Sequence, residues 1–349
     1  MKLRKRILII MLVAILMIAL SVILSACGRI EMYECYYENS ELYTIADHSE
    51  VEMTAMCDLD IKWFIGSITV QKSDEVSALT FYEENAGDVK TDADRTMHYY
   101  FDGKKLHIRY CKSGRIKFRP GGIVKHLYVF VPSTLTLQSV EIETTRTDET
   151  IVAGITADEV SINGNAKIHV ECTAREVGIE DSSSELYVNC PDSDVNIKNV
   201  YGSVNGECTA KDVVILANDV VNLNCTAKSV VIKSYYHSYC DVNLDCTADE
   251  IDIQTGSGDV TLTCDTLPKE LNIETESGDV QIYLTNERAF SVVYNTPRGE
   301  FEYEFDGLCR GDDMNVYNYL GGVQPNAEYY CVVNTQSGNL KVELIVEEK

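Results

Sequence analysis

Positive charge is scarce in this sequence. The 349 residues include 30 Lys and Arg against 55 Asp and Glu, which gives a formal net charge of −25 at pH 7. An acidic excess of this size repels the phosphates of nucleic acids and other anionic polymers, so it disfavours nucleic-acid binding. Histidine is also scarce, and no Cys-x-x-Cys or paired Cys/His spacing occurs, so we predict no metal and no cofactor. No serine–histidine–aspartate arrangement or phosphate-binding loop stands out, which disfavours an enzyme.

Long apolar runs are absent except near the start of the chain, where residues 7–24 carry no charge. Four basic residues precede this run (Lys2, Arg4, Lys5 and Arg6), the pattern of an export signal. The run ends at Leu24-Ser25-Ala26-Cys27, which resembles the lipobox of bacterial lipoproteins. The resemblance implies that residues 1–26 are a lipoprotein signal peptide and that lipidated Cys27 anchors the protein to a membrane. An uncleaved transmembrane helix is the alternative, since this run can just span a bilayer. Both interpretations place the remainder outside the cytoplasm, because the basic residues stay inside.

A repeated unit dominates residues 158–284. Six cysteines recur there at intervals of 17 to 21 residues: Cys172, Cys190, Cys208, Cys225, Cys246 and Cys264. Apolar and polar residues alternate ahead of each cysteine, and this period of two is typical of β-strands with one buried face. Two such strands cannot bury their apolar faces alone, whereas stacked copies can. We predict an all-β fold, a single-chain parallel β-solenoid of about ten turns over residues 132–349.

Alignment of the copies predicts which residues stack on one another. The first strand of each copy gives two inner columns: Val160, Val177, Val195, Val213, Val230, Ile251 and Leu271, and beside it Ile162, Ile179, Ile197, Ile215, Ile232, Ile253 and Ile273. The second strand gives two more: Ile168, Leu186, Val204, Val221, Val242, Val260 and Val280, and beside it Val170, Val188, Gly206, Leu223, Leu244, Leu262 and Ile282. A slip of one residue would expose a whole apolar set, so we expect a strongly fixed register. An outward line holds Asn205, Asn222 and Asn243, whose amides could hydrogen-bond along a ladder.

The six repeat cysteines are expected to form one ladder of buried thiols. At the ~4.8 Å spacing of parallel strands their side chains would point in parallel instead of at each other, so we predict small hydrophobic side chains and not disulfides. Outside the repeats, Cys35 and Cys57 could pair, and Cys331 is expected to point inward. The states of Cys111, Cys240 and Cys309 stay open.

The segments around the repeats have less regular patterns. Residues 27–50 show no clear period and are predicted to form a membrane-proximal tether. Residues 51–131 contain strands and are predicted to form an N-terminal β cap that covers the open end of the solenoid. The cap contains one basic interval (Lys112, Arg115, Lys117, Arg119 and Lys125). It could bind an anionic partner, although a solvated loop paired with nearby acids is the simpler explanation. Val333 to Leu344 is predicted to form the last turn.

Three turns share nearly the same sequence, in which Ser-Gly-Asp or Ser-Gly-Asn follows a threonine. Their glycines and polar residues are Gly258 and Asp259, Gly278 and Asp279, and Gly338 and Asn339. Glycine adopts positive φ without steric cost, and the following Asp or Asn can hydrogen-bond its own backbone. These turns, with the strand Val129 to Pro132, resemble an adhesin-type β-solenoid family of bacterial envelope proteins, a domain of unknown function, over about residues 55–346. The resemblance implies an extracytoplasmic scaffold or binding role, often associated with envelope stress or attachment, and it carries no catalytic residues.

A non-enzymatic surface scaffold or adhesin-like protein is therefore the expected function, with a membrane anchor and an envelope protein or glycan as its partner. The best candidate contact is the loop that lengthens one copy and contains Tyr235, Tyr236, His237 and Tyr239. Aromatic residues in loops favour recognition of sugars or proteins, but this loop could equally fold over the coil.

Two alternatives stay open. Parallel β-helices often carry polysaccharide lyases or hydrolases, which need carboxylates that converge on one patch. The candidates here are chosen by neighbourhood only: Asp241, Asp245, Glu250, Asp252, Asp259, Glu274 and Asp279. A solenoid stiffened by calcium is also compatible with the acidic charge, although the nonapeptide pattern of calcium-binding β-rolls is absent.

Overall fold

The structure is a computed structural model that describes residues 31–46, 48–86, 93–118, 124–164, 167–181, 185–199, 203–234, 238–264, 268–285, 290–303, 308–310, 316–319 and 330–345. The expected signal peptide and Cys27 lie outside these residues. Within the described ranges, no helix is long and apolar enough to cross a membrane. The helix found there is η1 (Ser40–Leu42), a single 3-10 turn, and nearly everything else is β-strand.

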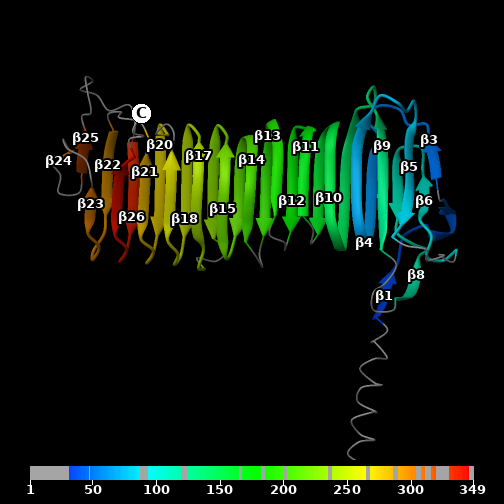
Figure 1. Ribbon diagram of the computed structural model, residues 1–349, viewed down its shortest axis with the longest axis horizontal. Helices are drawn as coiled ribbons and strands as arrows, with labels where there is room; N and C mark the ends of the chain where they lie inside the picture. The colour runs from blue at the N-terminus through cyan, green and yellow to red at the C-terminus, as the bar shows by residue number, and fades with distance from the viewer. Residues whose placement is uncertain are drawn as a thin grey trace, which may run out of the picture.

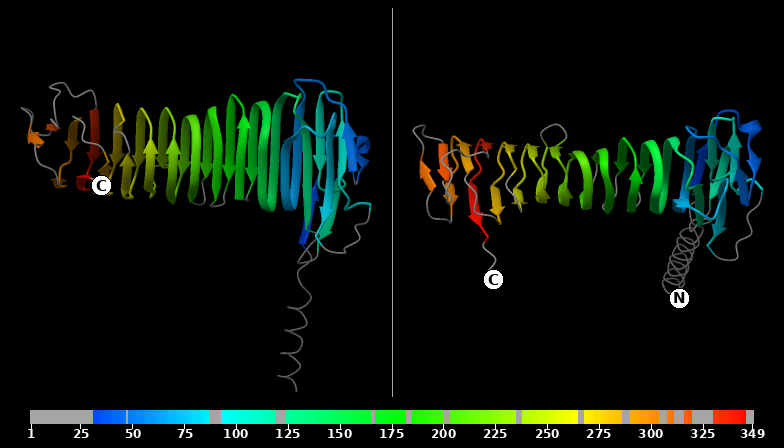
Figure 2. Two further views of the ribbon diagram at one scale, coloured as in Figure 1. Left: turned by 45° about the horizontal axis from the view of Figure 1, so that its top comes forward. Right: turned by 90° about the horizontal axis from the view of Figure 1, so that it is seen from above.

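The chain forms a parallel β-solenoid, as predicted (Figure 1). The turns form a long stack with the N-terminal cap at one end, and the two views in Figure 2 show the same arrangement. Its strands are β4 (Asp58–Ser73), β10 (Leu137–Gly164), β11 (Lys167–Thr173), β12 (Glu176–Asp181), β13 (Leu186–Asn199), β14 (Val204–Ala217), β15 (Val220–Thr226), β16 (Ser229–Ser234), β17 (Asp241–Thr247), β18 (Glu250–Thr255), β19 (Val260–Cys264), β20 (Glu270–Thr275), β21 (Val280–Leu284), β22 (Phe290–Asn295), β23 (Phe301–Tyr303), β26 (Tyr330–Thr335) and β27 (Leu340–Leu344). Each turn gives one strand to each of two faces, so β12 and β11 pair with different halves of β13.

The register of the first face confirms the prediction residue by residue. Val160 lies opposite Val177, and the column continues without a break to Leu271. The neighbouring column from Ile162 to Ile273 is continuous as well. Every member of both columns is at most 3% exposed. Burying one such side chain contributes about 1.5–3 kcal/mol, so these columns fix the register of the stack.

The second face departs from the predicted register at one step. Leu186 lies opposite Gly206 instead of Val204, so two successive turns are displaced by two residues against each other. From Val204 to Val280 the predicted column is continuous again. A displacement of two residues keeps the apolar side chains inside, because strand side chains alternate with a period of two.

Pro191 lies in the corner where this displacement ends. Four other copies run Cys-Thr-Ala into the corner, but Cys190 is followed by Pro191, which has no N–H to donate to a ladder. The displaced ladder ends at Cys190, which lies opposite Ala210 and not Cys208, and the register returns where Asp194 lies opposite Asp212. Gly206 fits the displaced strand, since its φ is 149° and a Cβ there would lie 1.6 Å from the Leu186 carbonyl oxygen. Only glycine permits that approach.

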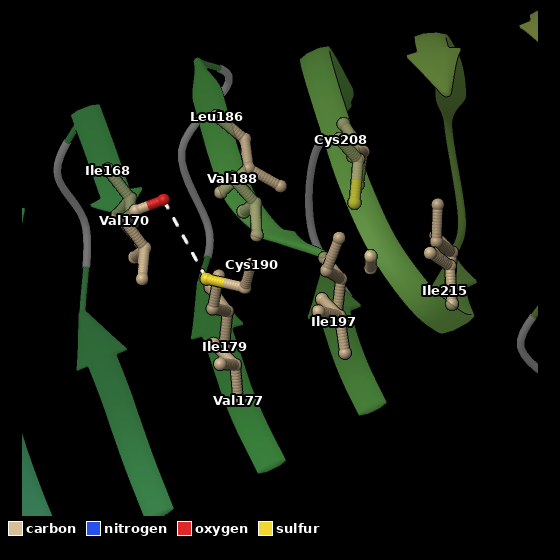
Figure 3. Packing of buried hydrophobic residues seen from close by; sticks show 14 of the residues in the cluster. Ile168, Val170, Val177, Ile179, Leu186, Val188, Cys190, Ile197, Cys208 and Ile215 are labelled. Atoms are coloured by element: carbon tan, nitrogen blue, oxygen red, sulfur yellow. Dashed lines mark hydrogen bonds between the residues drawn. The ribbon is translucent and has the colours of Figure 1, made fainter. Parts of the chain in front are cut away.

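The cysteine ladder is consequently split into two parts. Four members lie opposite one another in successive turns: Cys208, Cys225, Cys246 and Cys264. Cys190 instead lies beside Cys172, with 3.3 Å between the two sulfur atoms, and its thiol lies 3.9 Å from the Val170 carbonyl oxygen (Figure 3). The prediction of one column of six parallel thiols is therefore wrong at Cys190, although all six thiols are buried.

The outward asparagines form the predicted ladder. Asn222 Nδ2 donates to Asn205 Oδ1 at 2.6 Å, and Asn243 Nδ2 donates to Asn222 Oδ1 at 2.8 Å. Across the displaced step Tyr187 lies opposite Glu207, so the ladder does not extend toward the cap. The ring of Tyr187 instead lies 4.4 Å from the ring of His169.

Residues 31–51 belong to the cap, and the prediction of a tether there is wrong for the described residues. Three short strands of this segment pair antiparallel with later ones: β1 (Glu31–Cys35) with β8 (Gly114–Phe118), β2 (Thr44–Ile45) with β6 (His98–Phe101), and β3 (His48–Val51) with β5 (Leu79–Asn85). Strands of two to five residues are too short for alternation to be visible in the sequence.

The parallel stack also begins earlier than predicted. β4 is already a complete turn, because it pairs in parallel with β10 on one side and with β7 (Lys105–Arg109) and β9 (Lys125–Pro132) on the other. The apolar core continues through this region, where Trp63 and Leu127 are fully buried. The predicted boundary between cap and solenoid at residue 132 therefore divides strands of one sheet.

The last turn of the sequence is not the last turn in space. β26 pairs in parallel with β20 on one side and with β22 on the other, and β27 lies in the same way between β21 and β23. Figure 1 shows β26, in red, between β20 and the orange β22. Beyond β22 lie two antiparallel strands, β25 (Val316–Tyr319) and β24 (Leu308–Arg310). The predicted turn at residues 333–344 exists, but its predicted terminal position is wrong.

Candidate functional site

The glycines of the Ser-Gly-Asp turns allow the turns to stack. A Cβ at Gly278 would lie 1.7 Å from the Gly258 carbonyl oxygen, and one at Gly338 would lie 1.9 Å from the Gly278 carbonyl oxygen. None of these three glycines has positive φ, so the predicted reason for glycine is wrong. Glycine is required because successive backbones pass too closely for a side chain. Threonine supports the turn, since Thr275 Oγ1 accepts the Gly278 N–H at 3.0 Å.

The acids of these turns bond to the next turn and not, as predicted, to their own backbone. Asp241 Oδ1 accepts the Asp259 N–H at 2.9 Å, and Asp259 Oδ1 accepts the Asp279 N–H at 2.9 Å. Asp279 Oδ1 in turn accepts the Asn339 N–H at 2.7 Å. Each carboxylate thus joins two turns, which gives this row a structural role that requires no ligand.

The other candidate catalytic carboxylates lie away from this row. Asp252 Oδ1 accepts from Asn272 Nδ2 at 2.8 Å, another contact between turns. The remaining candidates have these strand neighbours: Asp245 with Thr263, Glu250 with Glu270, and Glu274 with Gln254. Within the described ranges, no group of three or more His, Cys, Asp or Glu side chains could hold a metal ion. Four of the candidate acids therefore contribute hydrogen bonds between turns: Asp241, Asp252, Asp259 and Asp279.

Of the four residues of the predicted aromatic contact, the structure describes Tyr239. Tyr235, Tyr236 and His237 lie outside the described residues. Tyr239 is 50% exposed, and its hydroxyl donates to Asp241 Oδ2. This hydrogen bond raises the pKa of Tyr239 to about 12. Tyr239 is therefore tied to the row of turn aspartates, on the surface of the solenoid.

The basic interval of the cap contributes one residue to the core. Lys125 is fully buried, and its Nζ lies 2.6 Å from Glu83 Oε2 and 4.0 Å from the Tyr110 ring centroid. Burial lowers the pKa of Lys125. A solvated loop is therefore the wrong interpretation for Lys125, whereas Lys112 does pair with Asp94 in solvent at 3.1 Å. The side chains of Arg115, Lys117 and Arg119 lie outside the described residues.

A pocket of about 560 Å³ opens in the cap. Its lining comes from the segment after β1 and from strands β4, β6 and β7. The lining is mostly aromatic and charged: Tyr36, Tyr37, Glu38, Asn39, Tyr43, Asp60, Lys62, Tyr100, Asp102, Lys105, His107 and Arg109. Alternate residues of β7 face the pocket, while Leu106 and Ile108 between them are fully buried in the core.

Arg109 and Asp60 form a nearly buried ion pair in this pocket, with side chains 5% and 12% exposed. Arg109 Nη2 lies 2.6 Å from Asp60 Oδ2, and Nη1 lies 3.0 Å from Oδ1. His107 Nδ1 lies 2.8 Å from Asp60 Oδ2. Burial by itself would raise the pKa of Asp60, but hydrogen bonds from His107 and Arg109 outweigh it and hold that pKa well below its usual range. The pocket thus contains a carboxylate and a guanidinium in fixed positions.

Aromatic rings surround this ion pair. The Arg109 guanidinium carbon lies 5.3 Å from the ring centroid of Tyr37 and 5.9 Å from that of Tyr43. The ring of Tyr100 is stacked on that of His107, with centroids 6.0 Å apart. Burial raises the pKa values of Tyr37 and Tyr43, so both phenols stay protonated at neutral pH and can donate hydrogen bonds. Tyrosine offers an apolar ring and a polar hydroxyl together, which suits a ligand with both kinds of surface.

The lysines of the pocket are balanced by acids of the next solenoid turn. Lys62 Nζ lies 2.5 Å from Glu143 Oε2, and Lys105 Nζ lies 2.8 Å from Glu141 Oε2. Together with the Arg109–Asp60 pair and the acids Glu38 and Asp102 of the lining, these contacts leave little uncompensated positive charge. The pocket therefore favours a polar, uncharged ligand over a strongly anionic one.

The cysteines outside the repeats also depart from the prediction. The thiol of Cys35 is hydrogen-bonded to Cys111, which lowers the pKa of Cys35. Cys57 lies instead beside Thr54, 3.5 Å from its Oγ1, so the suggested pairing of Cys35 with Cys57 is wrong. Burial, with the nearby Asp241 carboxylate, raises the pKa of Cys240 to about 12, which keeps it an inert thiol. Cys331 is buried, as expected, and the side chain of Cys309 lies outside the described residues.

The pocket residues were not found from the sequence. Asp60, His107 and Arg109 occupy polar positions of alternating strands, where charged side chains are usually solvated. Tyr37 and Tyr43 lie in the segment for which the sequence pattern predicts a tether. The density of tyrosine near residues 33–43 was the available signal, but the sequence does not show that this segment folds back on β6 and β8.

Residues 98–343 match the family model described as Toastrack DUF4097. The chain belongs to this family. The match confirms the resemblance to a domain of unknown function that the repeated turns suggested. It begins at β6, so the Toastrack region contains Tyr100, His107 and Arg109 but leaves out Tyr43 and Asp60.

Two solved structures are similar to this Toastrack chain. A putative cell adhesion protein from Clostridium sporogenes ATCC 15579 is 10% identical, with a TM-score of 0.19, and the comparison covers 85% of this chain and 98% of that one. A putative adhesin from Bacteroides fragilis NCTC 9343 is 11% identical, with a TM-score of 0.34, and the comparison covers 84% of this chain and 95% of that one. No curated protein matches the chain.

Proposed function

We propose that the protein is a non-enzymatic, adhesin-like binding protein of the cell envelope, anchored through lipidated Cys27, whose cap pocket binds a glycan. The observation that carries the proposal is the pocket itself, where tyrosine rings surround the fixed Arg109–Asp60 pair. Pyranose rings present apolar faces and hydroxyl edges, which match aromatic rings and fixed charged hydrogen-bonding groups respectively. The balanced charges of the pocket favour a glycan without a dense anionic charge.

The position of the anchor supports an envelope glycan as the ligand. Cys27 lies a few residues before β1, which is part of the cap. An anchor there holds the cap and its pocket next to the membrane, while the solenoid extends from the cap (Figure 1). The pocket would therefore meet glycans of the protein's own envelope first, and the solenoid would serve as a spacer or scaffold. The proposal extends to a role under envelope stress, which the family resemblance implies.

The non-enzymatic part of the proposal is supported by the contacts of the solenoid acids. Asp241, Asp259 and Asp279 hold adjacent turns together through backbone N–H groups. Carboxylates engaged in this way have a sufficient structural explanation. Asp60, the carboxylate of the pocket, is held ionised by Arg109 and His107. It is therefore poorly suited to act as a general acid.

Binding to soluble fragments of the cell-wall polysaccharides, measured by calorimetry, tests the pocket. We expect Tyr43→Ala and Tyr100→Ala to weaken binding at least tenfold, because each removes a ring from the pocket. Tyr283→Ala is the matched control, since Tyr283 is a half-buried tyrosine of the solenoid strand β21. Equal affinity in all three variants would show that the pocket does not bind the glycan.

Fractionation of cells tests the anchor separately. Cys27→Ala is expected to move the protein from the membrane fraction to the soluble fraction, because the acyl chains are lost. Cys57→Ala, which changes a buried cysteine of the body, is expected to stay with the membrane. Membrane association that is unchanged in Cys27→Ala would rule out the lipid anchor.

A further inference from the structure

The C-terminal turn occupies a slot between two turns that precede it in the chain. β26 is paired along both edges, because Leu271 and Val292 both lie opposite Cys331. β27 likewise has β21 on one side and β23 on the other. Figure 2 shows this red segment inside the stack and the orange strands outside it. The turn therefore satisfies two strand edges at once and separates β20–β21 from β22–β23.

The contacts across the slot are those of an ordinary repeat on both sides. Toward β21, the Asn339 N–H donates to Asp279 Oδ1 at 2.7 Å. Toward the β22–β23 turn, Asn339 Oδ1 accepts the Glu300 N–H at 2.9 Å, and the Gly338 carbonyl accepts from the Tyr294 hydroxyl at 2.6 Å. The side chains that enter the core are buried to the same degree as those of the central repeats: Cys331, Val333, Leu340 and Val342. The slot is thus specific for a strand–turn–strand unit of this repeat type.

The two turns that bound the slot carry matching features. Thr275 Oγ1 accepts the Gly278 N–H at 3.0 Å in one, and Thr296 Oγ1 accepts the Gly299 N–H at 2.8 Å in the other. A Cβ at Gly299 would lie 1.9 Å from the Gly338 carbonyl oxygen, as close as the contact between Gly338 and Gly278. Until the C-terminal turn arrives, both turns expose unpaired backbone groups and apolar side chains toward the slot. Such edges are templates for any chain that can pair with them.

In the sequence, the inserted turn (β26–β27) follows the turn that lies outside it in the stack (β22–β23). The connection from β23 to β26 passes through β24 and β25, which are held beside β22, and residues 320–329 then join β25 to β26. A chain covers up to about 3.3–3.6 Å per residue, whereas neighbouring turns are only ~4.8 Å apart, so residues 320–329 alone are long enough to reach beyond the chain's own slot. The identical turn of a neighbouring molecule would make the same hydrogen bonds and bury the same side chains.

We propose that the β26–β27 turn is exchangeable, and that the slot between β20–β21 and β22–β23 accepts this turn from a second copy of the chain. Exchange of an identical element between copies forms an oligomer without any new type of contact. The resulting dimer would be joined through the C-terminal ends of the two solenoids and would leave both cap pockets free. This proposal does not depend on the ligand of the cap.

Disulfide trapping between two differently tagged full-length chains tests the exchange. Asn295 Nδ2 donates to Asn334 Oδ1 at 2.8 Å across the boundary between β22 and β26. One chain carries N295C and the other carries N334C, and the two are co-expressed in the same cells. Each chain has only one introduced cysteine, so these two positions can be joined only between chains. Both chains also carry Cys309→Ser, and the native cysteines whose side chains the structure describes are all buried and do not compete.

We expect a disulfide-linked dimer of the two tagged chains, at least tenfold more abundant than in the control pair. The control pair combines N295C with S337C, because Ser337 is exposed in the same turn but does not pair with Asn295. Adding Gly338→Val to the N334C chain should abolish the linked dimer, since the new side chain would collide with the Gly278 carbonyl oxygen. Equal yields in the N334C and S337C pairs, or a linked dimer that persists with Gly338→Val, would overturn the proposal.

Discussion

At the scale of single residues, glycine sets how closely successive turns approach. Gly278→Ala places a Cβ 1.7 Å from the Gly258 carbonyl oxygen, a contact that only a backbone shift can relieve. Overpacking of this kind costs about 1–3 kcal/mol. We therefore expect the free energy of unfolding, measured by denaturant titration, to fall by that amount.

Gly178→Ala is the matched control for this substitution. Gly178 also lies in a solenoid strand, but the nearest atom to its Cβ would be the Val160 carbonyl oxygen at 4.0 Å. Alanine reduces the conformational freedom of the unfolded chain, so the free energy of unfolding should stay the same or rise by up to about 1 kcal/mol. A comparable loss of stability in both variants would contradict the stacking explanation.

Asp60 links the stability of the cap to pH. Its pKa is lower in the folded state than in the unfolded chain, so the folded state binds fewer protons. Its contribution to stability is complete above the unfolded carboxyl pKa of about 3.9 and is lost as the pH falls toward the folded pKa. Removing one partner of a buried pair costs about 3–5 kcal/mol, so Asp60→Asn should destabilise strongly at pH 7 and progressively less below pH ~4. Denaturant titrations at several pH values measure this, with exposed Asp74→Asn as the control. If the explanation were wrong, the difference in the free energy of unfolding between Asp60→Asn and the original chain would not change with pH.

At the scale of elements, hydrogen bonds between adjacent strands supplement the apolar columns. Asn222 has two ladder partners, Asn205 and Asn243, whereas Asn243 lies at the end of the ladder and has one. A hydrogen bond contributes about 0.5–1.5 kcal/mol, and exposed ones lie at the low end. Asn222→Ala should therefore lower the free energy of unfolding about twice as much as Asn243→Ala. Asn196→Ala, at an exposed position of the first face, should change it least. Thermal unfolding that ranks the three variants equally would show that the ladder adds no stability.

The solenoid elements could be predicted because their cause is local. Alternation within each strand and the spacing of the cysteines are enough to align Val160 with Val177 and Asn222 with Asn243. The displacement from Leu186 to Cys190 ends at a feature that the sequence does show, since Pro191 lies in the corner where the register returns. The turn glycines were identified for the wrong reason, because the distance between adjacent backbones is a property of the stack and not of the turn.

At the scale of the whole molecule, the parts that could not be predicted are those in which one segment folds back against strands that are far away in the sequence. The cap pocket requires Tyr37 and Tyr43 to meet Asp60 and Arg109, which come from strands far apart in the sequence. The insertion of β26 has the same character. Apolar and polar residues alternate in both β22 and β26, as they do in the repeats. The sequence of either strand therefore does not indicate which of them lies next to β20.

A stack of this kind is expected to unfold in parts, because each turn contacts only its neighbours. Gly278→Ala weakens the contact between the β18–β19 turn and the β20–β21 turn and leaves the N-terminal cap unchanged. Amide hydrogen exchange followed by mass spectrometry should therefore show faster exchange from β20 to β27 in this variant, while β4 to β9 exchange as in the original chain. In Gly178→Ala both regions should keep their original rates. An equal acceleration from β4 to β27 would mean that the molecule opens as one cooperative unit, and the description of its stability as a sum of contacts between neighbouring turns would then be wrong.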